Sequence, residues 1–127
     1  DWVGSGEGID TWLAPGFIDL QVNGFVGVDY CAPGASLEDI QRSIEAQFAT
    51  GVTRLFPTVI TGSEETMQAA FRNLVKAREG LAIGPALEAI HAEGPFISAE
   101  DGPRGAHPRG QCRPPSMDEW RRMQDAA

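Results

Sequence analysis

The sequence predicts an α/β fold with a parallel sheet, because strand-like and helix-like segments alternate along the chain. Apolar runs of strand length begin near residues 17, 52 and 86, at nearly equal intervals. Segments of helical period lie between them, and glycine or proline residues fall at the boundaries. Three strands would make a small sheet with exposed edges. The pattern is therefore typical of part of a larger fold, either a doubly wound sheet or a (β/α)8 barrel, which needs about 250 residues.

The first part of the chain is predicted to hold two strands. Residues 1–8 have no periodicity and are expected to form a loop or a frayed end. A short strand is expected over 9–13, and Ala14, Pro15 and Gly16 end it. The apolar run 17–22 predicts a buried strand. The glycine-rich segment 24–35 predicts a long loop.

A helix and a second strand follow. Ser36 is a good N-cap, and Gly51 is expected to close the helix that starts there. Its apolar residues recur at helical spacing: Leu37, Ile40, Ile44 and Phe48. The next strand is expected over 52–60, interrupted by Pro57.

Two further helices and a third strand complete the pattern. Ser63 is predicted to cap a helix that Gly80 ends. The apolar face of this helix is expected to consist of Met67, Phe71, Leu74 and Val75. A strand is expected over 86–92, and a long loop continues to Pro115. Ser116 and Glu119 have the spacing of a capping box at the start of the last helix.

The composition excludes several classes of partner. The chain has 127 residues and a net charge of −8, which argues against a surface for nucleic acid or anionic membrane. No apolar run approaches the roughly 20 residues of a membrane helix, and we expect no signal peptide. The two cysteines, Cys31 and Cys112, lie far apart and suggest an inert pair in a reducing cytoplasm.

Polar residues lie toward the carboxyl end of the first predicted strand, at the edge where parallel α/β folds place their active sites. Asp19, Gln21 and Asn23 are spaced two apart, so all three lie on one face of the strand. The alternative is a strand end without a function, whose residues are polar because they meet solvent.

His91 and Glu93 share one face at the end of the third predicted strand. A carboxylate and an imidazole at this spacing can bind a metal or share a proton. The alternative is a pair without a chemical function: a partly buried histidine beside a surface glutamate. A metal site needs about three protein ligands, and the chain has only two histidines, so a complete site within it is not expected.

The loop 101–110 carries Arg104, His107 and Arg109 among three glycines. Guanidinium groups make planar hydrogen bonds to sugar or phosphate oxygens, so the loop suits such a ligand. A solvated loop with no ligand is the alternative. The loop has neither the spacing nor the lysine of a P-loop.

Three segments, in this order and spacing, resemble N-acetylglucosamine-6-phosphate deacetylases of the amidohydrolase superfamily. They are Ala-Pro-Gly-Phe-Ile-Asp-Leu-Gln-Val-Asn-Gly at 14–24, Gly-Val-Thr-Arg-Leu-Phe-Pro-Thr at 51–58 and His-Ala-Glu-Gly-Pro-Phe at 91–96. The stretch Arg-Gly-Ala-His at 104–107 is similar to a loop that follows Glu-Gly-Pro in that family. The resemblance implies a (β/α)8 TIM-type barrel of a metal-dependent hydrolase, flanked by a small β domain. Residues 1–13 would be the end of that domain or a linker, and 14–127 the first three βα units of an incomplete barrel.

The resemblance also implies roles for individual residues. Glu93 would be a ligand of one divalent metal ion, zinc or similar. Ala106, by its backbone, and His107 would contact the substrate. Gln21 and Asn23, which stand where many superfamily members carry His-x-His, would line the pocket together with His91. The family's Asp base and two histidine ligands lie further along its sequence and have no counterpart here.

The function implied is deacetylation of N-acetylglucosamine 6-phosphate to glucosamine 6-phosphate and acetate. The expected partner is a small amino-sugar phosphate, with no nucleic acid and no membrane, in a cytoplasmic enzyme that forms a homo-oligomer, a dimer. The 127-residue chain alone is expected to be inactive. The alternatives are a non-catalytic remnant that acts as an oligomerising module, suggested by the exposed sheet edges, and another amidohydrolase.

Overall fold

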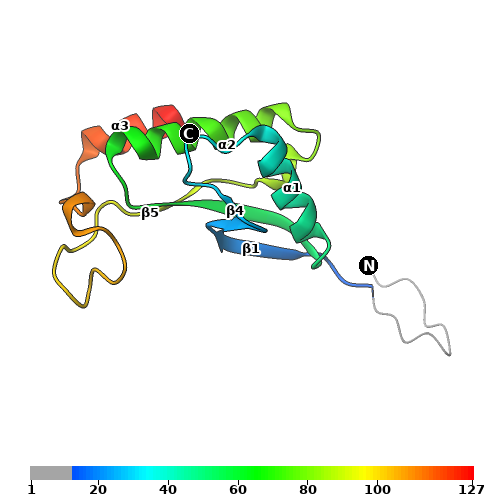
Figure 1. Ribbon diagram of the computed structural model, residues 1–127, viewed down its shortest axis with the longest axis horizontal. Helices are drawn as coiled ribbons and strands as arrows, with labels where there is room; N and C mark the ends of the chain where they lie inside the picture. Colours follow the sequence, from blue (N-terminus) through cyan, green and yellow to red (C-terminus); the bar gives the residue numbers. More distant parts are fainter. Residues whose placement is uncertain (1–12) are drawn as a thin grey trace.

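A three-stranded parallel sheet forms the base of the fold, as the alternating pattern predicted. The computed structural model describes residues 13–127, so the loop predicted over 1–8 and most of the strand predicted over 9–13 lie outside the described residues. The sheet has the order β1 (Phe17–Val22), β4 (Val52–Ile60) and β5 (His91–Glu93), and both pairings are parallel. β4 is therefore the central strand, and the ends of all three strands meet at one edge (Figure 1).

Three helices lie along one side of this sheet (Figure 1). They are α1 (Leu37–Phe48), α2 (Glu64–Gly80) and α3 (Met117–Ala126). α3 packs against α2, and α1 and α2 pack against β4. The described residues include no helix that is both long and apolar enough to cross a membrane.

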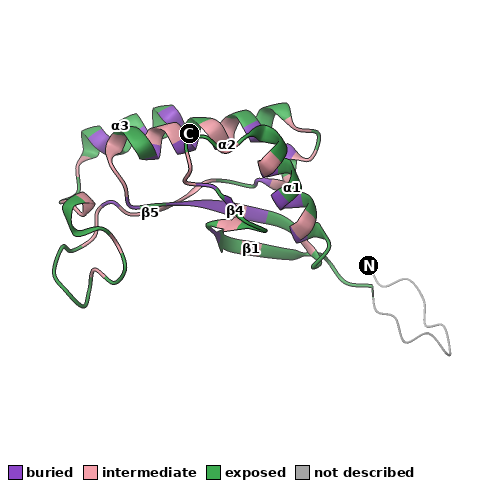
Figure 2. Ribbon diagram, viewed as in Figure 1, coloured by how far each residue is buried: buried purple, intermediate pink, exposed green. Residues whose placement is uncertain are grey.

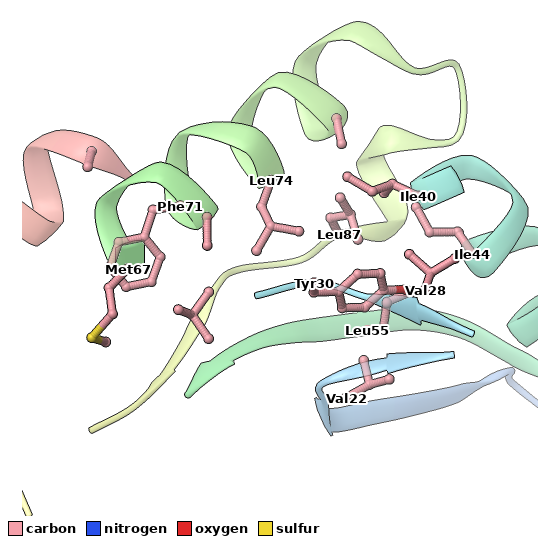
Figure 3. Packing of buried hydrophobic residues seen from close by; sticks show 14 of the residues in the cluster. Val22, Val28, Tyr30, Ile40, Ile44, Leu55, Met67, Phe71, Leu74 and Leu87 are labelled. Atoms are coloured by element: carbon pink, nitrogen blue, oxygen red, sulfur yellow. The ribbon is translucent and has the colours of Figure 1, made fainter. Parts of the chain in front are cut away.

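The core lies between the helices and the central strand (Figures 2 and 3). Ile40 and Ile44 of α1, Leu74 of α2 and Leu55 of β4 are at most 1% exposed, as predicted for the two isoleucines and Leu74. Each such side chain contributes about 1.5–3 kcal/mol of burial free energy. Met67 and Phe71 also belong to this cluster, as expected. Leu37 and Phe48, expected on the same face of α1, are more than a third exposed.

Each helix begins at the serine that the sequence predicted. The hydroxyls of Ser36, Ser63 and Ser116 accept hydrogen bonds from the backbone N–H three residues further on, at 3.0, 3.1 and 3.3 Å. These bonds satisfy donors that a helix start leaves open. The capping box is only half formed, because the Glu119 carboxylate binds Arg113 instead of returning to the backbone of Ser116.

The loop predicted over 24–35 contains a small hairpin that the sequence analysis missed. β2 (Gly24–Phe25) pairs antiparallel with β3 (Val28–Asp29). Gly24 has a φ of 155°, and a Cβ there would lie 1.9 Å from the Val28 carbonyl oxygen, so only glycine allows this close approach. The backbone N–H of Tyr30 donates to the Asn23 carbonyl at 3.0 Å, which closes the hairpin against the end of β1.

The third strand is shorter than predicted. Of the predicted range 86–92, Ala86 belongs to the 3-10 helix η1 (Gly84–Ala86), Leu87 makes only an isolated bridge to Leu55, and the strand β5 begins at His91. The prediction that Pro57 interrupts the second strand is wrong, since β4 runs through it. Proline is tolerated there because β4 has no β5 partner between Leu55 and Thr58, so no ladder donor is lost on that side.

The first strand is less buried than its apolar sequence predicted. Phe17 and Leu20 are both 70% exposed, and only Val22 joins the core. Figure 2 shows β1 mostly exposed, in contrast to the buried centre of β4. The reason is positional: β1 forms the edge of the described sheet, and the helices cover β4 instead.

Candidate functional site

Three segments far apart in the sequence converge on one carboxylate at the carboxyl edge of the sheet. Gln21, near the end of β1, donates from Nε2 to Glu93 Oε2 at 2.7 Å. His107, in the loop after β5, lies with Nε2 3.4 Å from Glu93 Oε1. The Glu93 side chain remains 30% exposed and that of His107 18% exposed. The carboxylate is thus oriented by protein groups on both oxygens while it still faces solvent.

The Glu93 backbone is fixed as firmly as its side chain. It pairs with Ile60 in the parallel ladder, and its carbonyl accepts from the buried Thr61 hydroxyl at 3.1 Å. Gly94 follows with a φ of 103°, and a Cβ at this position would lie 2.0 Å from Thr61 Oγ1. The glycine in Glu-Gly-Pro is therefore required by the close approach of this threonine.

His91 lies on the same face of β5, two residues before Glu93. Its Nδ1 is 3.2 Å from the hydroxyl oxygen of Thr58, the residue opposite it on β4. The ring is half-buried, and Thr58 is fully buried. Neither Thr58 nor Thr61 was singled out from the sequence, because only the folded chain shows that Thr58 lies opposite His91 and that Thr61, just beyond β4, bonds to the Glu93 carbonyl.

The other predicted residues lie nearby in different roles. Asp19 accepts from the backbone N–H of Gln21 at 3.1 Å, so it shapes the strand end instead of meeting Glu93. Asn23 is exposed and bonds through its carbonyl to Tyr30. Ala106 is exposed next to His107. Of the predicted polar group on β1, only Gln21 reaches the carboxylate.

The two arginines of the loop 101–110 bind mainly to other groups of the same loop. Arg104 donates to the His107 carbonyl and to Asp101, both at 2.7 Å, and Arg109 lies 2.6 Å from the same aspartate. The hydrogen bond from Arg104, followed by that from Arg109, lowers the pKa of Asp101. Arg104 thus holds the backbone of His107, and Asp101 offsets the positive charge on which the predicted anion site depended.

Cys31 is a further neighbour of the site. Its Sγ lies 3.6 Å from the Thr58 carbonyl and 3.4 Å from the Ile60 N–H, so it bonds to β4 beyond the last β1 pairing at Pro57. Burial is the main cause that raises the pKa of this thiol, and the charges of Asp29 and Glu93 raise it further. A protonated thiol is a poor nucleophile, which agrees with the expectation of an inert cysteine.

The described groups do not form a complete metal centre. A tetrahedral site takes about three protein ligands, and Glu93 and His107 bring together one carboxylate and one imidazole. Residues 13–127 contain no group of three histidine, cysteine or acidic side chains that could hold an ion. Within the described range, Glu93 and His107 are therefore too few to hold a metal ion by themselves.

A carboxylate, an amide and an imidazole gathered at the carboxyl edge of a parallel sheet define the kind of site that α/β enzymes use. The chain is similar in sequence to N-acetylglucosamine-6-phosphate deacetylases. It is 40% identical over 100 residues to the enzyme of Caenorhabditis elegans, covering 76% of this chain and 23% of the relative. It is 37% identical over 105 residues to the human enzyme, covering 80% and 24%. No family model matches the chain.

Solved structures agree with the sequence relatives. The fold superimposes on the crystal structure of the Mycobacterium smegmatis deacetylase with a TM-score of 0.73 at 27% identity, covering 88% of this chain and 30% of that one. For the Thermotoga maritima enzyme the TM-score is 0.65 at 33% identity, covering 85% and 28%. The resemblance to N-acetylglucosamine-6-phosphate deacetylases is therefore confirmed. The chain spans about a quarter of the length of the curated relatives it matches.

Proposed function

We propose that this chain is the first part of a metal-dependent deacetylase that hydrolyses N-acetylglucosamine 6-phosphate to glucosamine 6-phosphate and acetate. Residues 14–127 then form the first three βα units of a (β/α)8 barrel, and 1–13 the end of a small β domain or a linker. The observation that carries the proposal is the convergence of Gln21, Glu93 and His107, in a chain whose relatives bear this activity in their names. A mutant of the Mycobacterium smegmatis enzyme has been solved in complex with N-acetyl-D-glucosamine-6-phosphate.

The proposal gives each residue a part. Glu93 supplies one ligand to a single divalent metal ion, zinc or similar, whose other ligands come from the rest of the protein. Gln21 orients the Glu93 carboxylate through its amide, and Asn23 and His91 line the pocket beside it. His107 and the backbone of Ala106 contact the amino sugar. The active protein is expected to be a cytoplasmic homodimer.

The reaction is an amide hydrolysis. Water adds to the acetyl carbon, the bond from this carbon to the sugar nitrogen breaks, and the nitrogen takes a proton as the amine leaves. Glu93 Oε1 and His107 Nε2 lie 3.4 Å apart, too close for a water between them, so in this proposal the proton transfers belong to groups outside these residues. In this proposal the residues of this chain orient part of the site, and hydrolysis itself requires the whole protein.

The experiment measures acetate release from N-acetylglucosamine 6-phosphate by the complete protein, with zinc supplied. Glu93→Gln should lower kcat/KM by at least a hundredfold, because it removes a charged ligand while it keeps the shape. Glu100→Gln, an exposed position further along the same segment, is the matched control and should change little. Equal activity of the two variants would contradict the role of Glu93.

Two controls decide whether the 127-residue chain is itself the enzyme. We expect the isolated chain to bind zinc weakly and to release little acetate. Robust turnover by this chain with stoichiometric metal would overturn the proposal that it is only part of the site. The intact mass of the native protein is the complementary measurement, since a mass near 13.6 kDa would require another chain to complete the barrel.

A second amino sugar is a candidate substrate on a specific observation. The chain is 37% identical over 108 residues to an N-acetylgalactosamine-6-phosphate deacetylase from Shewanella, covering 85% of this chain and 26% of that relative. The two sugars differ only in the configuration of one hydroxyl, and both carry the acetamide. Parallel kcat/KM measurements on both phosphates decide between them, and activity on neither would refute the deacetylase proposal.

A further inference from the structure

The Thr58 hydroxyl lies within hydrogen-bond distance of two groups, a backbone carbonyl and the His91 ring. The Thr58 hydroxyl donates to the carbonyl of Phe56 at 3.1 Å, and the same oxygen lies 3.2 Å from His91 Nδ1. A hydroxyl has only one hydrogen to give. When that hydrogen points to Phe56, the oxygen can only accept from His91, and the ring must then carry its proton on Nδ1.

Burial favours the orientation in which the Thr58 hydroxyl donates to the Phe56 carbonyl. If the hydroxyl turned toward the ring, the Phe56 carbonyl would lose this hydrogen bond, and because Thr58 is 0% exposed no water takes the place of its hydroxyl. The parallel register places Thr58 directly opposite His91, which keeps the two side chains in contact. In a histidine, the hydrogen bond at one ring nitrogen decides the state of the other.

We infer that Thr58 holds the His91 ring in its Nδ1-protonated tautomer, so that the bare Nε2 is a hydrogen-bond acceptor beside Glu93. No residue of the described range forms a hydrogen bond to this Nε2, and His91 and Glu93 lie on one face of β5. This nitrogen would accept a hydrogen bond from an N–H or O–H group of a ligand, such as an amide or a sugar hydroxyl. Only the identity of that ligand rests on the proposed function.

Nitrogen-15 NMR of labelled histidine in mildly alkaline buffer tests the inference directly, because protonated and bare ring nitrogens have very different shifts. The chain has two histidines, so His107→Gln leaves the signals of His91 alone. We expect Nδ1 protonated and Nε2 bare. The opposite assignment, which free histidine favours, would overturn the inference.

Variants of Thr58 separate its hydroxyl from its shape. Thr58→Val keeps the size and removes the acceptor, and should shift His91 toward the Nε2-protonated form. Thr58→Ser keeps the hydroxyl and should retain the wild-type tautomer. An unchanged tautomer in Thr58→Val would refute the role of the hydroxyl, and if that variant fails to fold, the wild-type and serine spectra still decide.

Addition of N-acetylglucosamine 6-phosphate to the complete protein tests the acceptor. Binding that moves the His91 Nε2 signal toward the protonated range supports the inference, and binding detected at other signals without this shift contradicts the acceptor role. Absence of any binding would count against the proposed function, and the tautomer assignment would then decide the inference alone.

Discussion

Arg113 holds the segment after the His107 loop in place, and its removal should destabilise the chain strongly. The guanidinium donates from Nε to both oxygens of Glu119 at 3.0 and 3.1 Å, and from Nη1 to the carbonyls of Gly62 and Gln111 at 2.9 and 2.6 Å. It thereby ties α3 to the turn between β4 and α2. The Glu119 side chain is only 8% exposed, so Arg113→Met leaves a buried carboxylate without its partner.

The expected loss follows from these contacts. Breaking a buried ion pair by removing one partner costs about 3–5 kcal/mol. Arg113 itself is 24% exposed, so solvent already screens the pair in part and we place the loss near the lower end, at about 3 kcal/mol. With an m value of about 1–3 kcal/mol per M urea, the midpoint of unfolding followed by circular dichroism should fall by about 1–3 M.

Two controls make the reasoning refutable. Arg121→Met removes a partner of Asp118 in a pair whose side chains are 68% and 81% exposed, and should change the free energy of unfolding by no more than about 0.5 kcal/mol. Arg113→Met combined with Glu119→Leu should recover much of the loss, because no charge is then buried alone. A loss below about 1 kcal/mol for Arg113→Met, or no recovery in the double variant, would show that burial of Glu119 is not the cause.

Three further predictions concern the core, the pH dependence and the thiol. Leu55→Ala, at a fully buried position of β4, should destabilise by about 2–5 kcal/mol in the same urea assay, and a loss below 1 kcal/mol would mean that the core refills. The hydrogen bond from Arg122 is the main cause that lowers the pKa of Glu64, so this pair stabilises the fold above the ordinary carboxyl pKa and the stability is lost as pH falls through the lowered one. The midpoint of thermal unfolding should therefore depend less on acid pH in Glu64→Gln, and identical curves would contradict the linkage. Burial raises the pKa of Cys31, so a thiol reagent should label it far more slowly in the folded chain than in urea, as mass spectrometry of the labelled peptide can show.

Sequence reasoning found the parts of the fold that depend on local signals. Serine caps, apolar spacing and the alternation of strands with helices are properties of short segments, and the three helix starts at Ser36, Ser63 and Ser116 were predicted correctly. It missed the hairpin after Asn23 and misplaced the start of the third strand. Both depend on close backbone approaches in the folded chain, such as that of Gly84 to the Arg78 carbonyl, where a Cβ would lie 2.1 Å away.

Local sequence patterns predicted the candidate site only as separate groups, and the family resemblance was what assigned them to one pocket. Gln21, Glu93 and His107 were each singled out, but no local pattern states that the Gln21 amide donates to one Glu93 oxygen while the His107 ring lies near the other. The supporting threonines are less visible still, because Thr58 and Thr61 look like ordinary strand residues. The role of Thr58 comes from the register between β4 and β5, and that of Thr61 from the course of the chain just after β4, and sequence alone determines neither.

The composition of β1 supports the proposed barrel on physical grounds that are independent of the relatives. Phe17 and Ile18 are neighbours in this strand and so point to opposite faces, and they are 70% and 53% exposed. A strand with large apolar side chains on both faces is typical of a parallel sheet that is covered on both sides. In the described structure the helices lie on one side of the sheet and pack over β4, so neither face of β1 has the cover that its sequence is suited to. A closed barrel provides that cover, because side chains fill its interior and helices surround its exterior. β1, the strand that supplies Gln21 to the site, is therefore also the strand that the described residues leave uncovered.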